Sequence, residues 1–280
     1  MRDIGLHLRL TDSLIGLARK AQALELPIFQ CFFLHQESMR PVRPSHEEVA
    51  EFARIREQFK QLIVHSSYWT NLASMEPVSM RMIKHELNVA KRLHFNQLVI
   101  HPGCTKGIAR REDGIDMLVS RLNEMLKYEH DVQLVLENTA HGKHSIGSNL
   151  DDFKLILQKI DKPEKIAFCI DTAHAHAYGY ALNTADDRNQ FFTKLADTIG
   201  FERIALLHVN NTHGDAGSCL DRHALLDKGS ITLDALQAFV LHPAIAQVPM
   251  IMELPAVDQT TEIDQIRLVR DWHTERMFGL

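Results

Sequence analysis

Six short apolar runs of the sequence each end on an ionisable side chain. These side chains are His65, His101, Glu137, Asp171, His208 and Glu253. Imidazole and carboxylate groups that converge without a compensating cation lose solvation and repel one another. A bound metal removes that cost, and mixed nitrogen and oxygen ligands favour zinc or manganese over calcium or magnesium. Six ligands exceed the four of one tetrahedral ion, so the pattern predicts at least two ions bridged by a carboxylate.

Two local clusters add further candidate ligands. In DTAHAHAYGY, Asp171 and His174 are three residues apart, and in GSCLDRHALLDKG, Asp221 and His223 flank Arg222. An Asp-x-His segment with extended backbone places both side chains on the same side of the chain. A solvated polar loop would account equally well for either cluster taken alone.

These residues must be positioned by a regular alternation of elements. Nearly continuous apolar runs such as VQLVLE and IAFCID are typical of strands in a parallel sheet that is covered on both faces. Eight such runs are present, at 4–9, 27–33, 61–67, 97–103, 132–138, 166–172, 204–210 and 248–254. The pattern therefore predicts eight strands.

The segments between the runs have helical periodicity. Over residues 75–95, one helical face is predicted to hold Met75, Val78, Met82, Leu87, Ala90 and Leu93. Ser45 followed by Glu48 forms a capping-box pattern in front of a helix predicted over 46–60. The intervening segments are therefore predicted to be helices.

Strands that alternate with helices of this length predict βαβ units, and eight units without a linker predict a single-domain TIM (β/α)8 barrel over residues 1–280. An open doubly wound sheet is the alternative, but no GxGxxG follows the first predicted strand. In a TIM barrel the carboxyl ends of the strands form the active-site rim, which would bring the six strand-end residues together.

Composition limits the classes of partner and the compartment. A net charge of −5 argues against a generally basic nucleic-acid coat, but it permits a local basic patch or contacts through bound cations. The chain also has 17 histidines, an excess that suits metal binding. Four scattered cysteines without a CxxC pair fit a reducing cytoplasm.

No part of the sequence predicts membrane association or a protein partner. There is no apolar run of 18 residues, and the N-terminal segment, with Asp3, does not have the pattern of a secretory signal. No obvious exposed heptad pattern is present. We expect a cytoplasmic monomer with no obligate protein partner.

Seven stretches together resemble the endonuclease IV family, the zinc-dependent apurinic/apyrimidinic endonucleases of family 2. The resemblance runs in order from about residue 4 to residue 270. The stretches are IVHSSYWTNL, LVIHPG, LVLENTA, FCIDTAHAHAYGY, LLHVNNT, DRHALLDKGSI and PMIMELP.

The resemblance implies a site for three Zn²⁺ ions, one of which could be replaced by Mn²⁺. The first ion would be held by His65, His101 and Glu137. The second would share Glu137 and also bind Asp171, His208 and Glu253. The third would be held by His174, Asp221 and His223.

The resemblance also implies the reaction. The chain would hydrolyse a phosphodiester in double-stranded DNA on the 5′ side of an abasic site, as a step of base excision repair. Glu137 and Glu253 would be the catalytic carboxylates, with Glu253 orienting or deprotonating the attacking water. Tyr68 matches a family residue that enters the DNA, and His7 and Arg222 are further candidate substrate contacts.

Two loops depart from the family pattern. In LHQESMRPVRPS, Glu37 stands where the family has an inserting arginine and Met39 where it has a tryptophan, so Arg40 and Arg43 would have to supply the charge. The stretch NTAHGKHSIGSNL has additional residues, among them His141, Lys143 and His144. Two alternatives stay open: a metal-dependent sugar or sugar-phosphate isomerase or epimerase, and a non-catalytic metal-binding scaffold.

Overall fold

The computed structural model describes residues 2–35, 40–105, 108, 110–128, 130–142 and 144–278. Its main sheet is a closed barrel with the hydrogen-bonded strand order β1-β12-β9-β8-β7-β6-β5-β2. Neighbouring strands such as β2 and β5 or β8 and β9 run parallel. The predicted TIM barrel is therefore confirmed, and the open doubly wound sheet is excluded.

Each predicted strand contains one barrel strand, and every barrel strand ends before the predicted carboxyl end. The barrel strands are β1 (Ile4–His7), β2 (Ile28–Phe32), β5 (Gln61–His65), β6 (Gln97–Ile100), β7 (Gln133–Glu137), β8 (Ile166–Asp171), β9 (Ile204–His208) and β12 (Met250–Met252). Their inward and outward faces are both covered, and all six residues of β8 are buried, as the continuous apolar runs predict.

Two small hairpins were not predicted. The pair β3 (Leu34–His35) and β4 (Arg40–Pro41) is antiparallel, as is the pair β10 (Asn211–Thr212) and β11 (His223–Ala224). In the second hairpin Thr212 is the partner of His223. This pairing fixes the backbone at one of the candidate ligands.

The helices fill the segments between the barrel strands. They are α1 (Leu14–Ala23), α2 (His46–Arg56), α3 (Pro77–Arg92), α4 (Arg111–Met125), α5 (Asp151–Lys159), α6 (Thr172–Tyr178), α7 (Ala185–Thr198), α8 (Leu233–Val240) and α9 (Gln259–Phe278). The capping box of Ser45 and Glu48 is present at the start of α2, which ends at Arg56 rather than at residue 60. Within the described residues, no helix is both long and apolar enough to cross a membrane.

One part of the helical prediction is wrong. Met75 and Val78 are exposed, whereas Leu87, Ala90 and Leu93 of the same predicted face are buried. The helix α3 begins at Pro77, whose fixed φ suits the first helical position, so Met75 belongs to the preceding loop.

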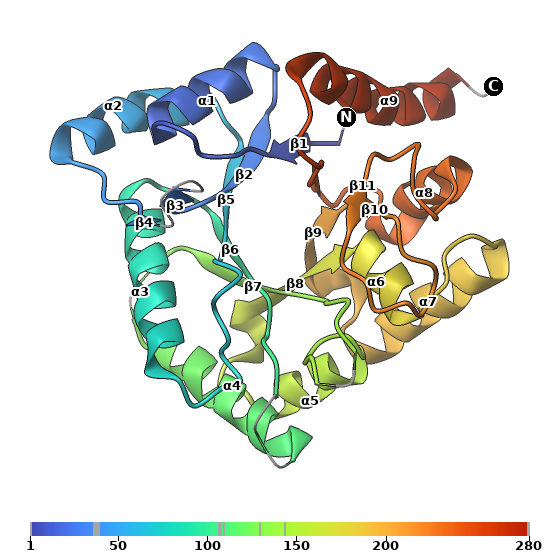
Figure 1. Ribbon diagram of the computed structural model, residues 1–280, viewed down its shortest axis with the longest axis horizontal. Helices are drawn as coiled ribbons and strands as arrows, with labels where there is room; N and C mark the ends of the chain where they lie inside the picture. The colour runs from blue at the N-terminus through green and yellow to red at the C-terminus, as the bar shows by residue number, and fades with distance from the viewer. Residues whose placement is uncertain are drawn as a thin grey trace. The chain divides into compact units, whose positions relative to one another are not determined.

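Contacts between Cα atoms divide the chain into two compact units. Unit 1 comprises residues 1–5, 137–154 and 168–280, and unit 2 comprises residues 6–136 and 155–167. In unit 2, α1 and α2 pack side by side (Figure 1). In unit 1, the short helix α6 packs against the hairpin strand β10 (Figure 1).

In unit 1, residues from both ends of the sequence are joined by hydrogen bonds. The amide of Met250 donates to the carbonyl of Asp3 at 3.0 Å. The buried guanidinium of Arg2 donates to the carbonyl oxygens of Val240 at 2.6 Å and Ile245 at 2.8 Å, and also to that of Val248. The positive charge of Arg2 is buried, and the hydrogen bonds to these three carbonyls stabilise it, since a buried charge is costly without such partners.

Candidate metal centre

Unit 1 brings four of the predicted ligands into one cluster. Glu137, Asp171 and His208 are the last residues of β7, β8 and β9, and Glu253 follows β12 by one residue. Their ligand atoms all lie within 4.8 Å of one another. From Nδ1 of His208, the distances are 3.0 Å to Glu137 Oε1 and 3.5 Å to Glu253 Oε2. Asp171 Oδ2 is 3.8 Å from the same nitrogen.

Two buried asparagines hold these carboxylates in place. Asn210 donates to Oδ2 of Asp171 at 2.5 Å and to Oε2 of Glu253 at 3.1 Å, and its Oδ1 accepts the amide of Glu253 at 2.7 Å. Asn138 accepts the amide of Asp171 at 2.7 Å and donates to its carbonyl at 3.0 Å. Neither asparagine was predicted. The sequence offered one indication of their role, namely that Asn138 directly follows Glu137 and Asn210 stands two residues after His208.

A second cluster in unit 1 contains His174, Asp221 and His223. Asp171 caps α6 by accepting the amide of His174 at 2.8 Å, which directs His174 toward the loop that follows β10. Nε2 of His174 lies 3.2 Å from Asp221 Oδ1, and Nε2 of His223 lies 3.4 Å from the same oxygen. The structure therefore brings together the residues that the two sequence clusters predicted.

Backbone carbonyls fix the ring orientation of both histidines. Nδ1 of His174 lies 2.9 Å from the carbonyl of Asn138, and Nδ1 of His223 lies 3.2 Å from the carbonyl of Glu253. A carbonyl only accepts, so Nδ1 carries the proton and a neutral ring keeps its lone pair on Nε2. Among the described residues, Nε2 of His223 is buried without a hydrogen-bond partner. Both Nε2 atoms are thus suited to metal ligation.

The electrostatics of unit 1 show an excess of buried carboxylate. Burial lowers the pKa of His208, but Cys169, Glu137 and Glu253 raise it further, so that its pKa lies well above the usual value. For His174, burial is likewise outweighed by Asp171, Asp221 and Glu137, and its pKa is also well above the usual value. The side chains of Glu137 and Asp171 are fully buried. The raised pKa values of both histidines reflect the negative charge of the surrounding carboxylates. A bound cation would stabilise the same cluster.

Cys169 on β8 lies next to the cluster. Its sulfur lies within 4.8 Å of the ligand atoms of Glu137 and His208, and its thiol hydrogen-bonds His208. Burial raises the pKa of this thiol to about 12. The neutral thiol is therefore a neighbour of the histidine, not a competing anion.

In unit 2, His65 and His101 lie side by side with ring centroids 5.0 Å apart. His65 is the last residue of β5, and His101 follows β6 by one residue. Nδ1 of His65 donates to the carbonyl of Ser66 at 2.8 Å, which again keeps the lone pair on Nε2.

Aromatic rings surround His65. The Phe32 ring lies 5.3 Å from the His65 ring and 4.8 Å from the Tyr68 ring. The His7 ring lies 4.4 Å from Phe32 and 6.2 Å from His65. Two of the three predicted substrate contacts, His7 and Tyr68, therefore adjoin a candidate ligand.

The remaining predicted residues are on the surface or outside the described part of the chain. Arg40, Arg43 and Arg222 are exposed. His141 and His144 are also exposed, and Nε2 of His141 lies 3.6 Å from Asp221 Oδ2. Glu37, Met39 and Lys143 lie outside the described residues.

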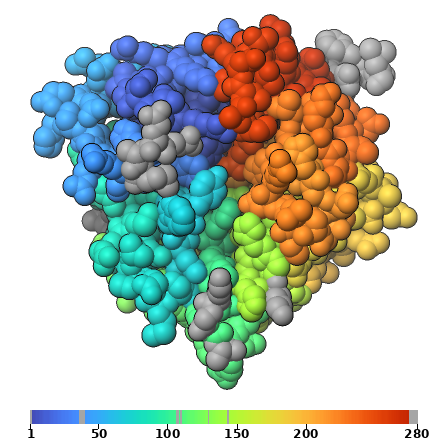
Figure 2. Space-filling model, in the orientation of Figure 1, coloured from blue at the N-terminus to red at the C-terminus, as the bar shows by residue number. Residues whose placement is uncertain are grey.

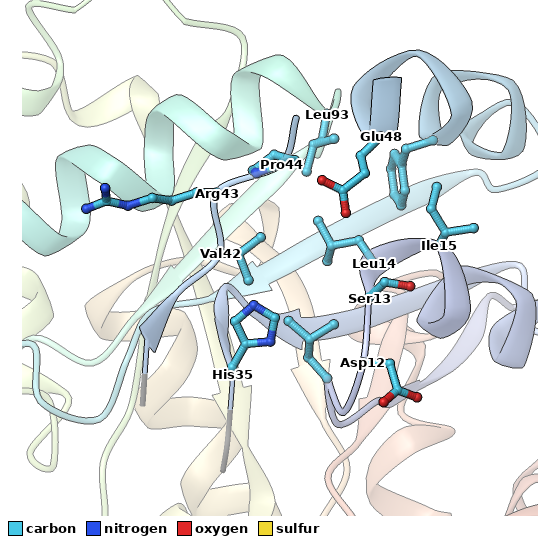
Figure 3. Close-up of a pocket in the computed structure, with 12 residues that line it drawn as sticks. Asp12, Ser13, Leu14, Ile15, His35, Val42, Arg43, Pro44, Glu48 and Leu93 are labelled. Atoms are coloured by element: carbon cyan, nitrogen blue, oxygen red, sulfur yellow. The ribbon is translucent and has the colours of Figure 1, made fainter. Parts of the chain in front are cut away.

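A small cavity of about 60 Å³ in unit 2 has none of the candidate ligands in its walls (Figure 3). It opens between α1, α2 and the β3–β4 hairpin. Its walls are Leu10, Asp12, Ser13, Leu14, Ile15, His35, Val42, Arg43, Pro44, Glu48, Phe52 and Leu93. This volume holds one or two water molecules. The Glu48 carboxylate there is already engaged in the capping box.

The donor sets in unit 1 fit zinc. Zinc bonds to nitrogen and oxygen of about 2.0–2.1 Å in a tetrahedron place two ligand atoms about 3.3 Å apart. The separations of 3.2 and 3.4 Å around Asp221 Oδ1 match that edge. The separation of 3.0 Å between Glu137 and His208 is slightly shorter. Histidine and carboxylate without thiolate also suit zinc or manganese.

Comparison with known proteins gives a consistent match. The family described as "Xylose isomerase-like TIM barrel" matches residues 18–275. A relative named "Probable endonuclease 4" from Halorhodospira halophila is 31% identical, over 95% of this chain and 93% of its own length. A second protein of that name, from Methanoculleus marisnigri, is 34% identical over 75% of this chain and 76% of its own.

A solved structure is also similar along its whole length. The crystal structure of endonuclease IV from Thermus thermophilus superposes with a TM-score of 0.84 at 28% identity. The alignment covers 98% of this chain and 99% of that one.

Proposed function

Because the chain belongs to the xylose isomerase-like TIM barrels and, within them, to the endonuclease IV family, we propose that it is a zinc-dependent phosphodiesterase that cleaves DNA 5′ of abasic sites. The hydrolase class follows from family membership. The use of zinc, the number of ions and the residues that bind them are our proposal.

One observation carries the proposal. Glu137, Asp171, His208 and Glu253 place their ligand atoms within 4.8 Å of one another, although two of the three carboxylates are fully buried. Burying several carboxylates together is unfavourable without a cation. A bound metal ion would therefore stabilise a site of this composition.

Three zinc ions account for all nine predicted ligands. His174, Asp221 and His223 would hold one ion, and Asp171, His208 and Glu253 would hold another together with Glu137. The remaining ion would bind His65, His101 and Glu137. In support, β5, β6 and β7 are consecutive in the barrel, and parallel neighbours end at the same edge of a sheet.

Bound zinc would supply Lewis acidity toward the phosphodiester and lower the pKa of a water molecule toward neutrality. The chain's own residues prepare the site. Glu253, held through Asn210, would be the carboxylate that orients the water or accepts its proton. Glu137 would be shared between two neighbouring ligand sets. Tyr68, His7 and Arg222 would contact the DNA.

The test is cleavage of a duplex that contains one tetrahydrofuran abasic analogue. We expect the zinc-loaded protein to nick the strand 5′ of the analogue and leave a 3′-hydroxyl that a polymerase extends. The matched undamaged duplex and the variant Glu253→Gln are the controls. An intact damaged duplex, with zinc or manganese present, would refute the proposal.

The isomerase alternative has less support. A sugar isomerase of this fold needs one or two ions, which would leave the cluster of His174, Asp221 and His223 without a role. Conversion of a sugar or sugar phosphate by a preparation that fails to nick the damaged duplex would favour that alternative.

A further inference from the structure

The loop after β7 carries histidine side chains that the proposed site does not use. It contains the additional residues of the stretch NTAHGKHSIGSNL, among them His141 and His144. His141 reaches one of the candidate ligands, since its Nε2 lies 3.6 Å from Oδ2 of Asp221. Figure 2 shows this loop, in light green, next to the orange segment between β10 and β11 on the surface of unit 1. Two loops of unit 1 therefore meet at a candidate ligand.

The two carboxylate oxygens of Asp221 face different groups. Oδ1 lies 3.2 Å from Nε2 of His174 and 3.4 Å from Nε2 of His223, separations that match the edges of a zinc tetrahedron. Oδ2 is the oxygen that His141 approaches. Oδ1 is thus placed for an ion and Oδ2 for a hydrogen-bond donor, which is the usual division of roles in a carboxylate that binds metal.

Asp221 lies in a less protected place than two other candidate carboxylates. Asp171 ends a barrel strand and Glu253 follows one, and Asn210 donates to both. Asp221 lies in the loop between β10 and β11, outside the helices and strands of the described residues, and its side chain is 22% exposed. A side chain in such a place loses more rotamer freedom when it binds an ion, and a neighbouring donor that restricts it beforehand reduces this loss.

The loop of His141 is closed at its base by hydrogen bonds. Thr139 Oγ1 hydrogen-bonds Ser145 Oγ at 2.9 Å and Ser148 Oγ at 2.8 Å, and all three side chains are buried. Ala140, the residue before His141, is fully buried as well. The imidazole of His141 is therefore on the surface, but its backbone is attached to a buried frame.

The loop of Asp221 is held by the neighbouring helix and by the loop of His141. Carbonyl oxygens of α6 accept the amides of Gly217 at 3.2 Å and Cys219 at 2.8 Å. Gly142, the residue after His141, packs against the same segment, because a Cβ added there would lie 3.9 Å from Cys219 Sγ. The approach of His141 to Asp221 is therefore a consequence of two anchored backbones in contact.

We propose that His141 is a positioning residue for Asp221. It donates its Nε2 hydrogen to Oδ2 and thereby holds Oδ1 toward an ion bound with His174 and His223. The separation of 3.6 Å is just above hydrogen-bond length, and rotation of the His141 side chain, which is 59% exposed, would close it. A neutral ring can supply the hydrogen, so no positive charge on His141 is needed. The inference rests on the proposed function, because it takes this ion as bound.

Zinc affinity tests the proposal directly. In competition with a chelating dye, His141→Ala should weaken one zinc site about 10- to 100-fold, the range for loss of an outer hydrogen bond to a metal ligand. The other zinc sites should keep their wild-type affinity, because His141 contacts none of their ligands in the proposed arrangement. Dialysis of the variant against the dye should accordingly leave one zinc ion fewer per chain than in the wild-type protein by elemental analysis.

Two further variants distinguish positioning from packing. His141→Gln should recover most of the zinc affinity, because the glutamine amide places an N–H donor near the position of the imidazole Nε2. His213→Ala, which removes another exposed histidine of unit 1 directly after β10, is the matched control and should bind zinc like the wild-type protein.

The outcomes separate the two proposals. Equal zinc affinity of His141→Ala and the wild-type protein, or a loss that His141→Gln does not recover, would overturn the role of His141. Nicking of the tetrahydrofuran duplex by the wild-type protein would in that case leave the proposed function standing. A wild-type protein that binds zinc but fails to nick would refute the proposed function, whereas the zinc titrations of the variants would still decide the role of His141.

Discussion

Asn210 donates its side-chain amide to Oδ2 of Asp171 at a distance of 2.5 Å. The same NH₂ group reaches Oε2 of Glu253, and the amide oxygen accepts the Glu253 backbone. One neutral side chain thus fixes two candidate ligands that belong to different strands. Asn210 satisfies part of the hydrogen-bonding capacity of each carboxylate without adding a charge. The remaining lone pairs of both carboxylates are left for a cation.

Replacing Asn210 should therefore damage metal binding more than folding. We expect Asn210→Ala to weaken zinc affinity about 10- to 100-fold, as losses of such outer contacts do, when titrated against a chelating dye. The matched control is Asn211→Ala. The Asn211 side chain donates to the carbonyls of Leu226 and Ile231, so its loss should lower the melting temperature instead. Equal zinc affinity of Asn210→Ala and the wild-type protein would contradict the role.

Removal of metal should destabilise the protein. The carboxylates of Glu137 and Asp171 are fully buried, so chelation leaves their charge to be balanced only by protons on His174 and His208. We expect a chelator to lower the melting temperature and added zinc to restore it. When free zinc is 100 times its dissociation constant, each site should raise the free energy of unfolding by about 2.7 kcal/mol. Elemental analysis should give three zinc ions per chain. Fewer than two would contradict the three-ion assignment.

Glu86 gives a prediction for the pH dependence of the metal-free protein. Burial raises the pKa of this carboxyl from 4.5 to about 8, against smaller lowering effects of the Ser67 amide and His65. Between these two pH values the folded state holds a proton that the unfolded state has released. Stability should therefore decrease as pH rises from 4.5 to 8.

Glu86→Gln should remove this decrease, since it keeps an oxygen acceptor for Ser67 and cannot ionise. In urea titrations, the gain in unfolding free energy relative to the wild-type protein should grow across this pH range, to at most about 5 kcal/mol. Glu51→Gln, at an exposed surface ion pair with Arg19, should change stability by less than about 1 kcal/mol at any pH. A gain that does not vary with pH would rule out this explanation.

Cys169 should matter through His208. Because its thiol hydrogen-bonds this histidine, Cys169→Ala should weaken zinc affinity about tenfold, and Cys169→Ser should recover part of the loss. Cys31→Ala makes the same chemical change at another fully buried barrel-strand cysteine. It should lower stability to a similar degree and leave zinc affinity intact. Matching zinc affinities in the two alanine variants would show that Cys169 has only a packing role.

The barrel could be predicted because each strand is a continuous apolar run between helical segments. The strand ends were less accurate: β6 and β12 end one residue before His101 and Glu253. The two hairpins were missed because strands of two residues show no periodicity. Met75 was assigned to the helix because apolar spacing alone does not show that Pro77 begins it.

The candidate ligands could be predicted from the sequence, but the residues that hold them in place could not. Asn138 and Asn210 act through backbone groups and neighbouring carboxylates, and such contacts leave no pattern in residue spacing. Glu86 has the appearance of an ordinary helical glutamate in the sequence. Its role beneath the loop of Tyr68 depends on a tertiary contact with Ser67. That the nine residues bind zinc stays a prediction.

The pairing of the first barrel strand with the last has a consequence for synthesis on the ribosome. One partner of β1 is β12, and Arg2 donates to carbonyls of residues 240–248. These hydrogen bonds of β1 and Arg2 cannot form until residues 240–252 have been synthesised. At about 5–20 residues per second, roughly 250 residues take ~12–50 s to translate. The edge of β1 that pairs with β12 must stay open for that time, while its other edge can pair with β2. Barrel closure therefore follows the synthesis of β12, and removal of either β1 or β12 removes one half of the same seam.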